Sequence, residues 1–389
     1  MSHESRSGIR KKPIRVLVLR GVDGAGGGAD EIILRNACEI DQERFTLRQC
    51  FLRHHRDDAF TFEQRCRELG VDFCQILHKG PLDRTVLPQL RNIIRDFEPN
   101  IVHSHEYKAN FYNLLASRGE RFAKLSTCHG WTGHSWRERF IYYPGDRIIL
   151  RSFDRLIAVS DDIRHQLTRY GVNKEQVDVV LNGVNPDEFV HKQEIRQNAR
   201  RQLNVTENDI VIGAVGRIER QKRFDVLVQA IHELKRRGVH VKLFIAGEGS
   251  LRTAIEQLIQ RLKLSESCKL LGHCPNMKEL YQAFDVLAQA SDYEGTPTVV
   301  VEAMALRVPI VATVAGGTEQ LIDDRVHGLL VPCRNATRLA EAIIETIEKK
   351  DATAVRVENA RQRVETELSF RHRLKKLQSI NEQLCTGDD

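Results

Sequence analysis

Two glutamates around the start of an expected helix are the strongest candidates for ligand chemistry. Glu294 and Glu302 lie eight positions apart in the segment EGTPTVVVE. We expect a helix over residues 296–306, with Thr296 as its N-cap and Pro297 at its first position. Eight helical residues span about 12 Å, and the free N–H groups at the helix start suit a diphosphate. Because the helix body is apolar nearly all round, Glu302 needs either a ligand or an internal arginine as its partner.

Basic residues after an apolar strand form the second group of candidates. Arg217 and Lys222 occur in the segment GRIERQK, directly after a strand expected at residues 210–215. Two cations in a loop at the carboxyl end of a strand would stabilise a diphosphate and the charge that grows on it as it leaves. We interpret Arg220 and Arg223, in the same loop, as solvated side chains.

Both groups belong to long alternations of strand and helix patterns. In the first half, a helix is expected to start near Ala29, and the other expected segments are strands at 15–20, 45–52, 101–105, 124–128, 156–160 and 177–181 and helices at 62–69, 86–97 and 162–170. After a polar stretch at residues 185–209, the expected strands are 210–215, 241–246, 269–271, 286–290, 309–313 and 328–331, alternating with helices at 224–236, 251–263, 277–283, 296–306, 319–323 and 337–349. Two such series predict two doubly wound parallel sheets, which bind ligands at the carboxyl ends of their strands.

The fold class expected from this pattern is α/β, with two Rossmann-like domains facing a central cleft. We expect one domain at residues 1–186, a second domain at 187–365, and a C-terminal helix within 366–389 that packs back on the first domain. A chain of 389 residues is long enough for two domains of ordinary size.

The composition excludes several classes of protein. With 41% hydrophobic and 29% charged residues, the chain is globular rather than disordered. A net charge of +6, spread over both halves, argues against a nucleic-acid binder. The nine cysteines include no CxxC pair, which favours a reduced, cytoplasmic compartment and no zinc cluster. No signal peptide is expected, and the apolar region at 298–314 contains Glu302 and Arg307, so it is no ordinary membrane span.

The order of motifs in the second half resembles the C-terminal domain of glycosyltransferase family 4, a retaining family of GT-B fold. The matching segments are GRIERQK at 216–222, FIAGEG at 244–249, LG at 271–272, ELY at 279–281, EGTPTVVVE at 294–302, GGTE at 316–319 and GLLVP at 328–332. The resemblance implies that Arg217 and Lys222 hold the diphosphate of a nucleotide sugar and that Glu302 binds the ribose. It also implies that Glu294 contacts the donor sugar together with Gly295, Thr296 and Pro297, and that His273 borders the base.

The first half is similar to the same family at two places. Gly27 and Gly28 resemble the glycine turn after the first strand, and His129 matches an active-site histidine near the donor sugar. A dinucleotide-binding reading of the glycine turn lacks the acidic residue expected about 20 positions on, since residues 48–52 offer none. Two departures, Ala290 where a proline is common and the polar Thr296 after Gly295, leave the donor sugar open.

The implied activity is retaining transfer of a hexose-type sugar from an NDP-sugar to a glycan or lipid-linked acceptor, in cell-surface polysaccharide or glycolipid synthesis. The catalytic residues would be Glu294, His129, Arg217 and Lys222. Two alternatives stay open: an NDP-sugar epimerase of the same fold, and a non-catalytic module that binds sugar nucleotides. The nucleotide sugar is a co-substrate, and no cofactor is expected.

A metal site is not expected either. His103 and His105 form an HxH pair, but no carboxylate cluster accompanies it, and the cations Arg217 and Lys222 make a metal unnecessary for the diphosphate. Residues 130–143 gather both tryptophans with other aromatics and arginines, a composition that suits peripheral contact with the inner face of a membrane. The alternative is a loop of the acceptor domain that packs on its own sheet.

Overall fold

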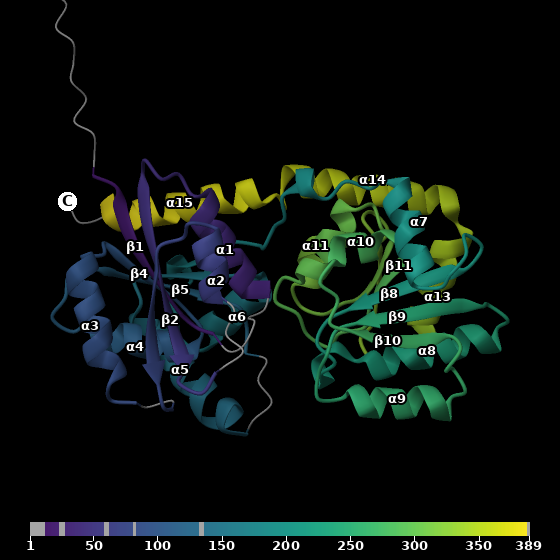
Figure 1. The fold of residues 1–389 in the computed structure, drawn as a ribbon, viewed down its shortest axis with the longest axis horizontal. Coiled ribbons are helices and arrows are strands. Elements are labelled where there is room, and N and C mark those ends of the chain that lie inside the picture. Colours follow the sequence, from purple (N-terminus) through teal and green to yellow (C-terminus); the bar gives the residue numbers. More distant parts are fainter. Residues whose placement is uncertain (1–11, 23–27, 58–61, 81–82, 132–135, 387–389) are drawn as a thin grey trace, which may run out of the picture. The chain divides into compact units, whose positions relative to one another are not determined.

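A computed structural model describes residues 12–22, 28–57, 62–80, 83–131 and 136–386 of the chain. These residues form two compact units, each built around one parallel sheet (Figure 1). The N-terminal unit comprises Met1–Ala158, Arg164–Val180 and Leu374–Asp389, and the C-terminal unit comprises Val159–Ile163 and Leu181–Arg373.

The sheet of the N-terminal unit has the strand order β3-β2-β1-β4-β5-β6-β7, and neighbouring strands are parallel. Its strands are β1 Ile14–Gly21, β2 Phe45–His54, β3 Phe73–His78, β4 Ile101–His105, β5 Ala123–Cys128, β6 Arg155–Ala158 and β7 Val177–Val179. Successive side chains point to opposite faces, so Leu52 packs with α3 (Val86–Phe97) and α4 (Tyr107–Ala116), whereas Phe51 packs with residues of α1 (Gly28–Glu39) and α2 (Phe62–Glu68). Helices therefore cover both faces, as a doubly wound sheet requires.

The sheet of the C-terminal unit has the order β10-β9-β8-β11-β12-β13 and is also parallel. Its strands are β8 Ile210–Val215, β9 Val241–Ala246, β10 Cys268–Gly272, β11 Val286–Gln289, β12 Ile310–Thr313 and β13 Leu329–Val331. One core joins Ile212 to residues of α8 (Phe224–Arg236), α9 (Arg252–Arg261) and α13 (Ala336–Glu348). The other core joins Val211 to α7 (Gln193–Gln202), α10 (Met277–Gln282), α11 (Thr298–Ala305) and α14 (Lys350–Thr366).

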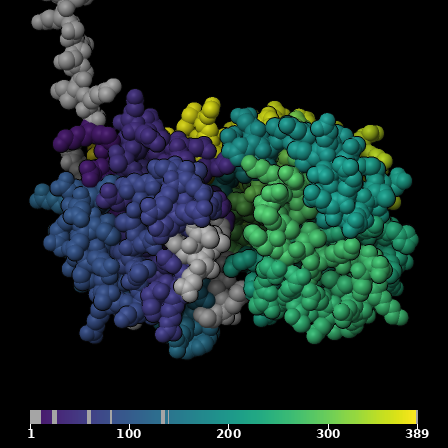
Figure 2. Space-filling model, viewed as in Figure 1, coloured from purple at the N-terminus to yellow at the C-terminus, as the bar shows by residue number. Residues whose placement is uncertain are grey.

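The remaining helices are α5 Tyr143–Ile149, α6 Asp161–Arg169, α12 Thr318–Leu321 and α15 Phe370–Thr386. From Leu374 onward, α15 belongs to the N-terminal unit. Leu374, Leu377 and Ile380 on its inner side are buried, while Lys375 and Lys376 are exposed. This division into an apolar and a charged side is that of an amphipathic helix packed on a core. The C-terminal end of the chain, yellow in Figure 2, lies partly at the surface. Among the described helices, none is both long and apolar enough to cross a membrane.

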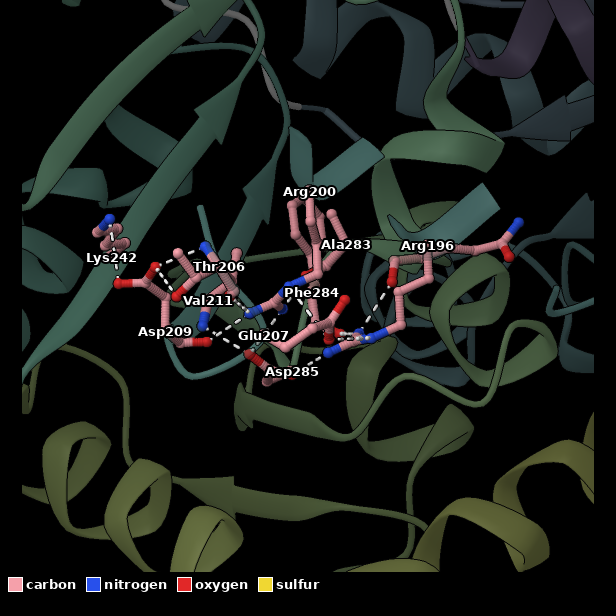
Figure 3. A network of polar contacts seen from close by, with 11 residues as sticks. Arg196, Arg200, Thr206, Glu207, Asp209, Val211, Lys242, Ala283, Phe284 and Asp285 are labelled. Atoms are coloured by element: carbon pink, nitrogen blue, oxygen red, sulfur yellow. Dashed lines mark hydrogen bonds and ion pairs between the residues drawn. The ribbon is translucent and has the colours of Figure 1, made fainter. Parts of the chain in front are cut away.

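The prediction of two doubly wound parallel sheets is confirmed, but the sequence patterns missed some elements. Strand β3 and helix α4 were not predicted, and α7 lies inside the polar stretch at 185–209. The polar pattern hid α7 because the helix is held by charged side chains as well as by apolar ones. Figure 3 shows these side chains, which include Arg196 and Arg200.

Arg200 is 1% exposed and joins α7 to the amino ends of two strands. Its guanidinium donates to the carbonyl oxygens of Ala283 (2.9 Å), Thr206 (2.6 Å) and Asp209 (2.5 Å) and to Asp285 Oδ2 (3.2 Å). Asp285 Oδ2 also accepts the Val211 N–H at 2.7 Å, at the start of β8. Both terminal nitrogens of the guanidinium are thereby hydrogen-bonded, and the network fixes the end of the sheet opposite to the carboxyl ends of the strands.

Candidate active site

The carboxyl ends of β8 and β11 mark the place where the C-terminal sheet reverses its strand order. β8 and β11 are neighbours, but the strand after β8 adds on one side of the pair and the strand after β11 adds on the other. The connections that leave these two strands diverge, which opens a crevice where ligands of doubly wound sheets bind. The loops that follow β8 and β11 contain the predicted residues Arg217, Lys222 and Glu294.

Lys222 and Glu294 meet at this crevice. Lys222 Nζ lies 2.6 Å from Glu294 Oε1, and the same oxygen accepts a hydrogen bond of 2.5 Å from Ser291 Oγ. Glu294 is 5% exposed, whereas Lys222 is partly exposed. The carboxylate is therefore held in one place by a cation and a hydroxyl, while the ammonium group keeps access to a ligand. Ser291 was not predicted as a site residue, because its contact depends on the loop conformation.

Asp292 ties the loop after β11 to its surroundings. Its backbone N–H donates to Gln221 O at 2.9 Å, and its carboxylate forms ion pairs with Arg223 (3.2 Å) and Arg334 (2.9 Å). The interpretation of Arg223 as a solvated side chain is therefore wrong: it pairs with Asp225 and Asp292, whose hydrogen bonds raise the pKa of the guanidinium. Burial alone would raise the pKa of Asp292, but the two arginines outweigh it and lower this pKa.

The rest of the loop after β8 presents Arg217 to solvent. Gly216 has a φ of 149°, and a Cβ added to Gly247 would lie 2.0 Å from Gly216 O, so the two glycines allow a close approach of two backbone segments. Arg217 and Arg220 are both exposed, as was predicted for Arg220. Within the described part of the chain, no carboxylate forms an ion pair with Arg217, whose guanidinium is thus available to an anion.

Helix α11 begins at Thr298, two residues later than the sequence indicated. Pro297 occupies the N-cap position, and no side chain caps the helix. The predicted roles of Thr296 as N-cap and Pro297 as first helical residue are therefore wrong, because Pro297 has an extended backbone with ψ 103°. Gly295 and Thr296 form the turn before the helix, and the Gly317 N–H fixes this turn by donating to Glu294 O at 3.0 Å.

Glu302 lies on α11 next to a cavity of about 380 Å³. Tyr281 Oη donates to Glu302 Oε2 at 2.7 Å, and Tyr281 is fully buried. Burial, and then the charge of Glu302, raise the pKa of the phenol well above its usual value, so the tyrosine stays a donor. Tyr281 is thus an internal partner of Glu302 that the sequence did not predict. The cavity is also lined by Phe189 and by residues 275–279. His273 is exposed and is not among the lining residues.

In the N-terminal unit, His129 follows β5 and contacts a second histidine. Its Nε2 lies 3.1 Å from His105 Nδ1, at the end of β4, and His105 stacks on His103 with ring centroids 4.4 Å apart. His103 Nε2 is hydrogen-bonded to Thr127 Oγ1 at 2.8 Å.

The predicted glycine turn is described only in part: Gly28 is the first residue of α1, and Gly27 lies outside the described residues. Among the described residues, no group of three His, Cys, Asp or Glu side chains is placed to hold a metal ion.

Two Rossmann-like parallel sheets, one of them with a paired lysine and glutamate at its switch point, are the arrangement of the GT-B fold. The family model "Glycosyl transferases group 1" matches residues 195–363, and the model "Glycosyltransferase Family 4" matches residues 37–188. The chain belongs to glycosyltransferase family 4, group 1 type, as the sequence motifs implied.

Similar proteins agree with this assignment. The chain is 29% identical over 283 residues to an uncharacterized glycosyltransferase of Methanocaldococcus jannaschii, covering 70% of this chain and 72% of that one. It is 25% identical over 348 residues to the capsular polysaccharide biosynthesis glycosyltransferase CapM of Staphylococcus aureus, covering 85% and 91%. Among solved structures, Anabaena HepE in complex with UDP-glucose has the same fold, with a TM-score of 0.83 at 20% identity over 95% of this chain and 100% of that chain.

Proposed function

We propose that the chain is a retaining glycosyltransferase that moves a hexose-type sugar from a nucleotide diphosphate to a glycan or lipid-linked acceptor. The observation that carries this proposal is the Lys222–Glu294 pair at the switch point of the C-terminal sheet. The proposal is supported by the complexes of HepE with UDP and with UDP-glucose, and by CapM, whose name places it in capsular polysaccharide biosynthesis.

In the proposed binding mode, each residue meets the part of the donor that suits its charge. Arg217 and Lys222 neutralise the diphosphate, and the first N–H groups of α11 point toward it as well. Glu294 accepts hydrogen bonds from the sugar hydroxyls, and Glu302 accepts them from the ribose while Tyr281 holds its carboxylate. His129 acts near the donor sugar. Lys222 changes part of its contact from Glu294 to the phosphate when the donor binds.

The proposed chemistry retains the configuration of the anomeric carbon. The bond from this carbon to the phosphate oxygen breaks, and the acceptor oxygen forms its bond on the same face. The leaving phosphate takes the proton of the acceptor hydroxyl, and Arg217 and Lys222 stabilise the charge on the phosphate. We propose that these two cations make a metal ion and a cofactor unnecessary for this step.

We further propose that the N-terminal unit touches a membrane surface through the aromatic segment that contains residues 136–143. Trp136 is 62% exposed and Phe140 is 67% exposed, and Ile141 and Ile148 are exposed as well. Arg137 stacks on Trp136 with its guanidinium 5.8 Å from the ring centroid. Exposed aromatics next to arginines match the interface of a membrane that carries anionic lipids.

A thermal-shift panel of UDP-, GDP- and ADP-sugars tests the donor. A ligand at 100 times its dissociation constant adds about 2.7 kcal/mol to the unfolding free energy, so the correct donor stands out from the others. If none of the nucleotide sugars raises the unfolding temperature, the proposal is wrong. Incubation with the selected donor alone separates the alternatives: an epimerase produces the 2-epimer, whereas a binding module leaves the donor unchanged even when acceptors are added.

A further inference from the structure

Glu106 holds a backbone conformation that residues with side chains rarely adopt. Its φ is 81° and its ψ is 160°, in a region that is essentially restricted to glycine. The residue directly follows β4, which neighbours β1 at the place where the N-terminal sheet reverses its strand order. Ligands of doubly wound sheets bind at this place. A strained non-glycine residue there calls for a functional explanation.

The carboxyl group of Glu106 is buried without full compensation. Its Oε1 is buried and has no hydrogen-bond partner among the described residues. A Cβ added to Gly21 would lie only 2.5 Å from this oxygen, so the carboxyl group occupies the space that glycine leaves. The nearby cations are engaged elsewhere, Arg20 with Asp30 at 2.8 Å and Lys108 with His78 at 3.2 Å.

These surroundings determine the charge of Glu106. Burial raises the pKa of the carboxyl group to about 7; Arg20 on β1, Lys108 on α4 and a hydrogen bond from the Ala109 N–H oppose the rise, and Asp146 on α5 adds to it. Near neutral pH the group is therefore present in both its neutral and its ionised form.

Asp146, a second buried carboxyl in the same unit, shows what a structural role looks like. It is 5% exposed, and both of its oxygens accept hydrogen bonds, Oδ1 from Asn110 Nδ2 at 2.7 Å and Oδ2 from Trp131 Nε1 at 2.9 Å. In a buried carboxyl group with a structural role, both oxygens have hydrogen-bond donors in this way. Glu106 adds backbone strain and a buried oxygen that the fold leaves unsatisfied, and neither stabilises the unit.

The chemistry of the site indicates which ligand it takes. A hydroxyl both donates and accepts hydrogen bonds, so it pairs with either protonation state of a carboxyl group. An ionised carboxylate repels phosphate, and the nearby Arg20 and Lys108 disfavour a cationic ligand. Glu106 also directly follows His105, which contacts His129, so it lies at the same sheet edge as the histidine proposed to act near the sugar.

We propose that Glu106 binds a hydroxyl group of the sugar acceptor, and that the chain keeps a strained glutamate after β4 for this purpose. The proposal rests on the proposed function, because it assigns one residue of the acceptor site of that transferase.

The test compares Glu106→Gly and Glu106→Gln with the wild-type chain in two measurements. Glycine relieves the strain and removes the buried carboxyl, so the unfolding temperature of Glu106→Gly is expected to rise. Transfer from the donor that the thermal-shift panel selects to a set of octyl glycosides is followed by mass spectrometry. Losing a hydrogen bond to a charged group should lower kcat/KM for the glycoside by at least about 10-fold in both variants, while the donor still stabilises them as it does the wild type.

Glu98→Gly is the matched control, because Glu98 is an exposed residue with a φ of 45° at the end of α3. This control is expected to be at least as stable as the wild type and fully active. Unchanged transfer by Glu106→Gln and Glu106→Gly, or a lower unfolding temperature of Glu106→Gly, would overturn the proposal. If the wild-type chain uses none of the octyl glycosides, the assignment of a sugar hydroxyl as the ligand is wrong. Failure of every nucleotide sugar to stabilise any variant would instead refute the proposed transferase activity.

Discussion

Lys222 Nζ and Glu294 Oε1 lie 2.6 Å apart although 72 positions separate the two residues in the chain. Their contact joins the loops that leave β8 and β11, the two neighbouring strands between which the sheet order reverses. A cation and a carboxylate are thereby placed together where an anionic, hydroxyl-rich ligand would bind. Ser291 and Asp292 fix the same loop, so the pair is preorganised before any ligand arrives.

Asp292→Asn tests whether the position of this loop matters. The substitution weakens the ion pairs to Arg223 and Arg334. Because these ion pairs are partly exposed, their loss should lower the unfolding free energy by about 1 kcal/mol or less. Transfer should fall about 10-fold because the loop moves relative to the donor. Asp225→Asn, which breaks only the other contact of Arg223, is the control and should retain activity. Equal kinetics of all three proteins would show that the Asp292 ion pairs do not position the site.

Glu106→Gln should change the pH dependence of stability. The pKa of this carboxyl is about 7 in the folded chain and about 4.3 in a model peptide, so the folded state binds the proton more tightly. Below about pH 4.3 the carboxyl is neutral in both states and the folded chain bears no cost of a buried charge; stability then falls as pH rises through about 7. Unfolding midpoints in urea between pH 5 and pH 8 should therefore fall more steeply for the wild type than for Glu106→Gln. Parallel curves would mean that the group does not titrate in this window.

Arg200→Met should destabilise the C-terminal unit by about 3–5 kcal/mol, because three carbonyl oxygens lose their buried donor, whereas Asp285 keeps its ion pair with Arg196. Arg201→Met, at the exposed neighbouring position, is the control and should stay within about 0.5 kcal/mol of the wild type. Urea unfolding of the two variants measures the difference. A similar midpoint for both would contradict a structural role of the Arg200 network.

Replacing both Trp136 and Phe140 by serine should weaken binding to vesicles that contain anionic lipids by at least about 10-fold, since two large apolar side chains no longer enter the interface. Vesicle sedimentation measures the binding, and the unfolding temperature checks that the fold is intact. The double variant Leu69→Ser/Leu77→Ser, also at exposed apolar positions of the N-terminal unit, is the control. If the wild type does not sediment with the vesicles, the aromatic segment is no membrane contact.

Several features of the site could be predicted from the sequence, and others could not. Residues at strand ends of a βα series lie at a binding edge, so Arg217 and Lys222 were predicted from their place after an expected strand. Glu294 was predicted from its spacing to Glu302 around an expected helix start. The partners Ser291 for Glu294 and Tyr281 for Glu302 depend on side-chain geometry that spacing does not encode.

Backbone conformation explains the other differences between the sequence predictions and the structure. Thr296 and Pro297 fit the pattern of an N-cap followed by proline, but the extended ψ of Pro297 makes α11 begin at Thr298. Glu106 gave no signal, because a glutamate after a strand looks like an ordinary polar residue until its φ is known. Arg223 appeared solvated for a similar reason, since its carboxylate partner Asp292 is far away in the chain.

In the proposed mechanism, Lys222 and Glu294 act together on a nucleotide-sugar donor. The most direct test measures the rate of sugar transfer from the selected donor by Lys222→Ala, Glu294→Gln and the control Arg220→Ala, which changes an exposed cation of the same loop. We predict that each of the first two variants loses at least about 100-fold, the scale of one preorganised transition-state contact, and that the control is unaffected. Near-normal transfer by Lys222→Ala or by Glu294→Gln would show that the pair does not act on the donor.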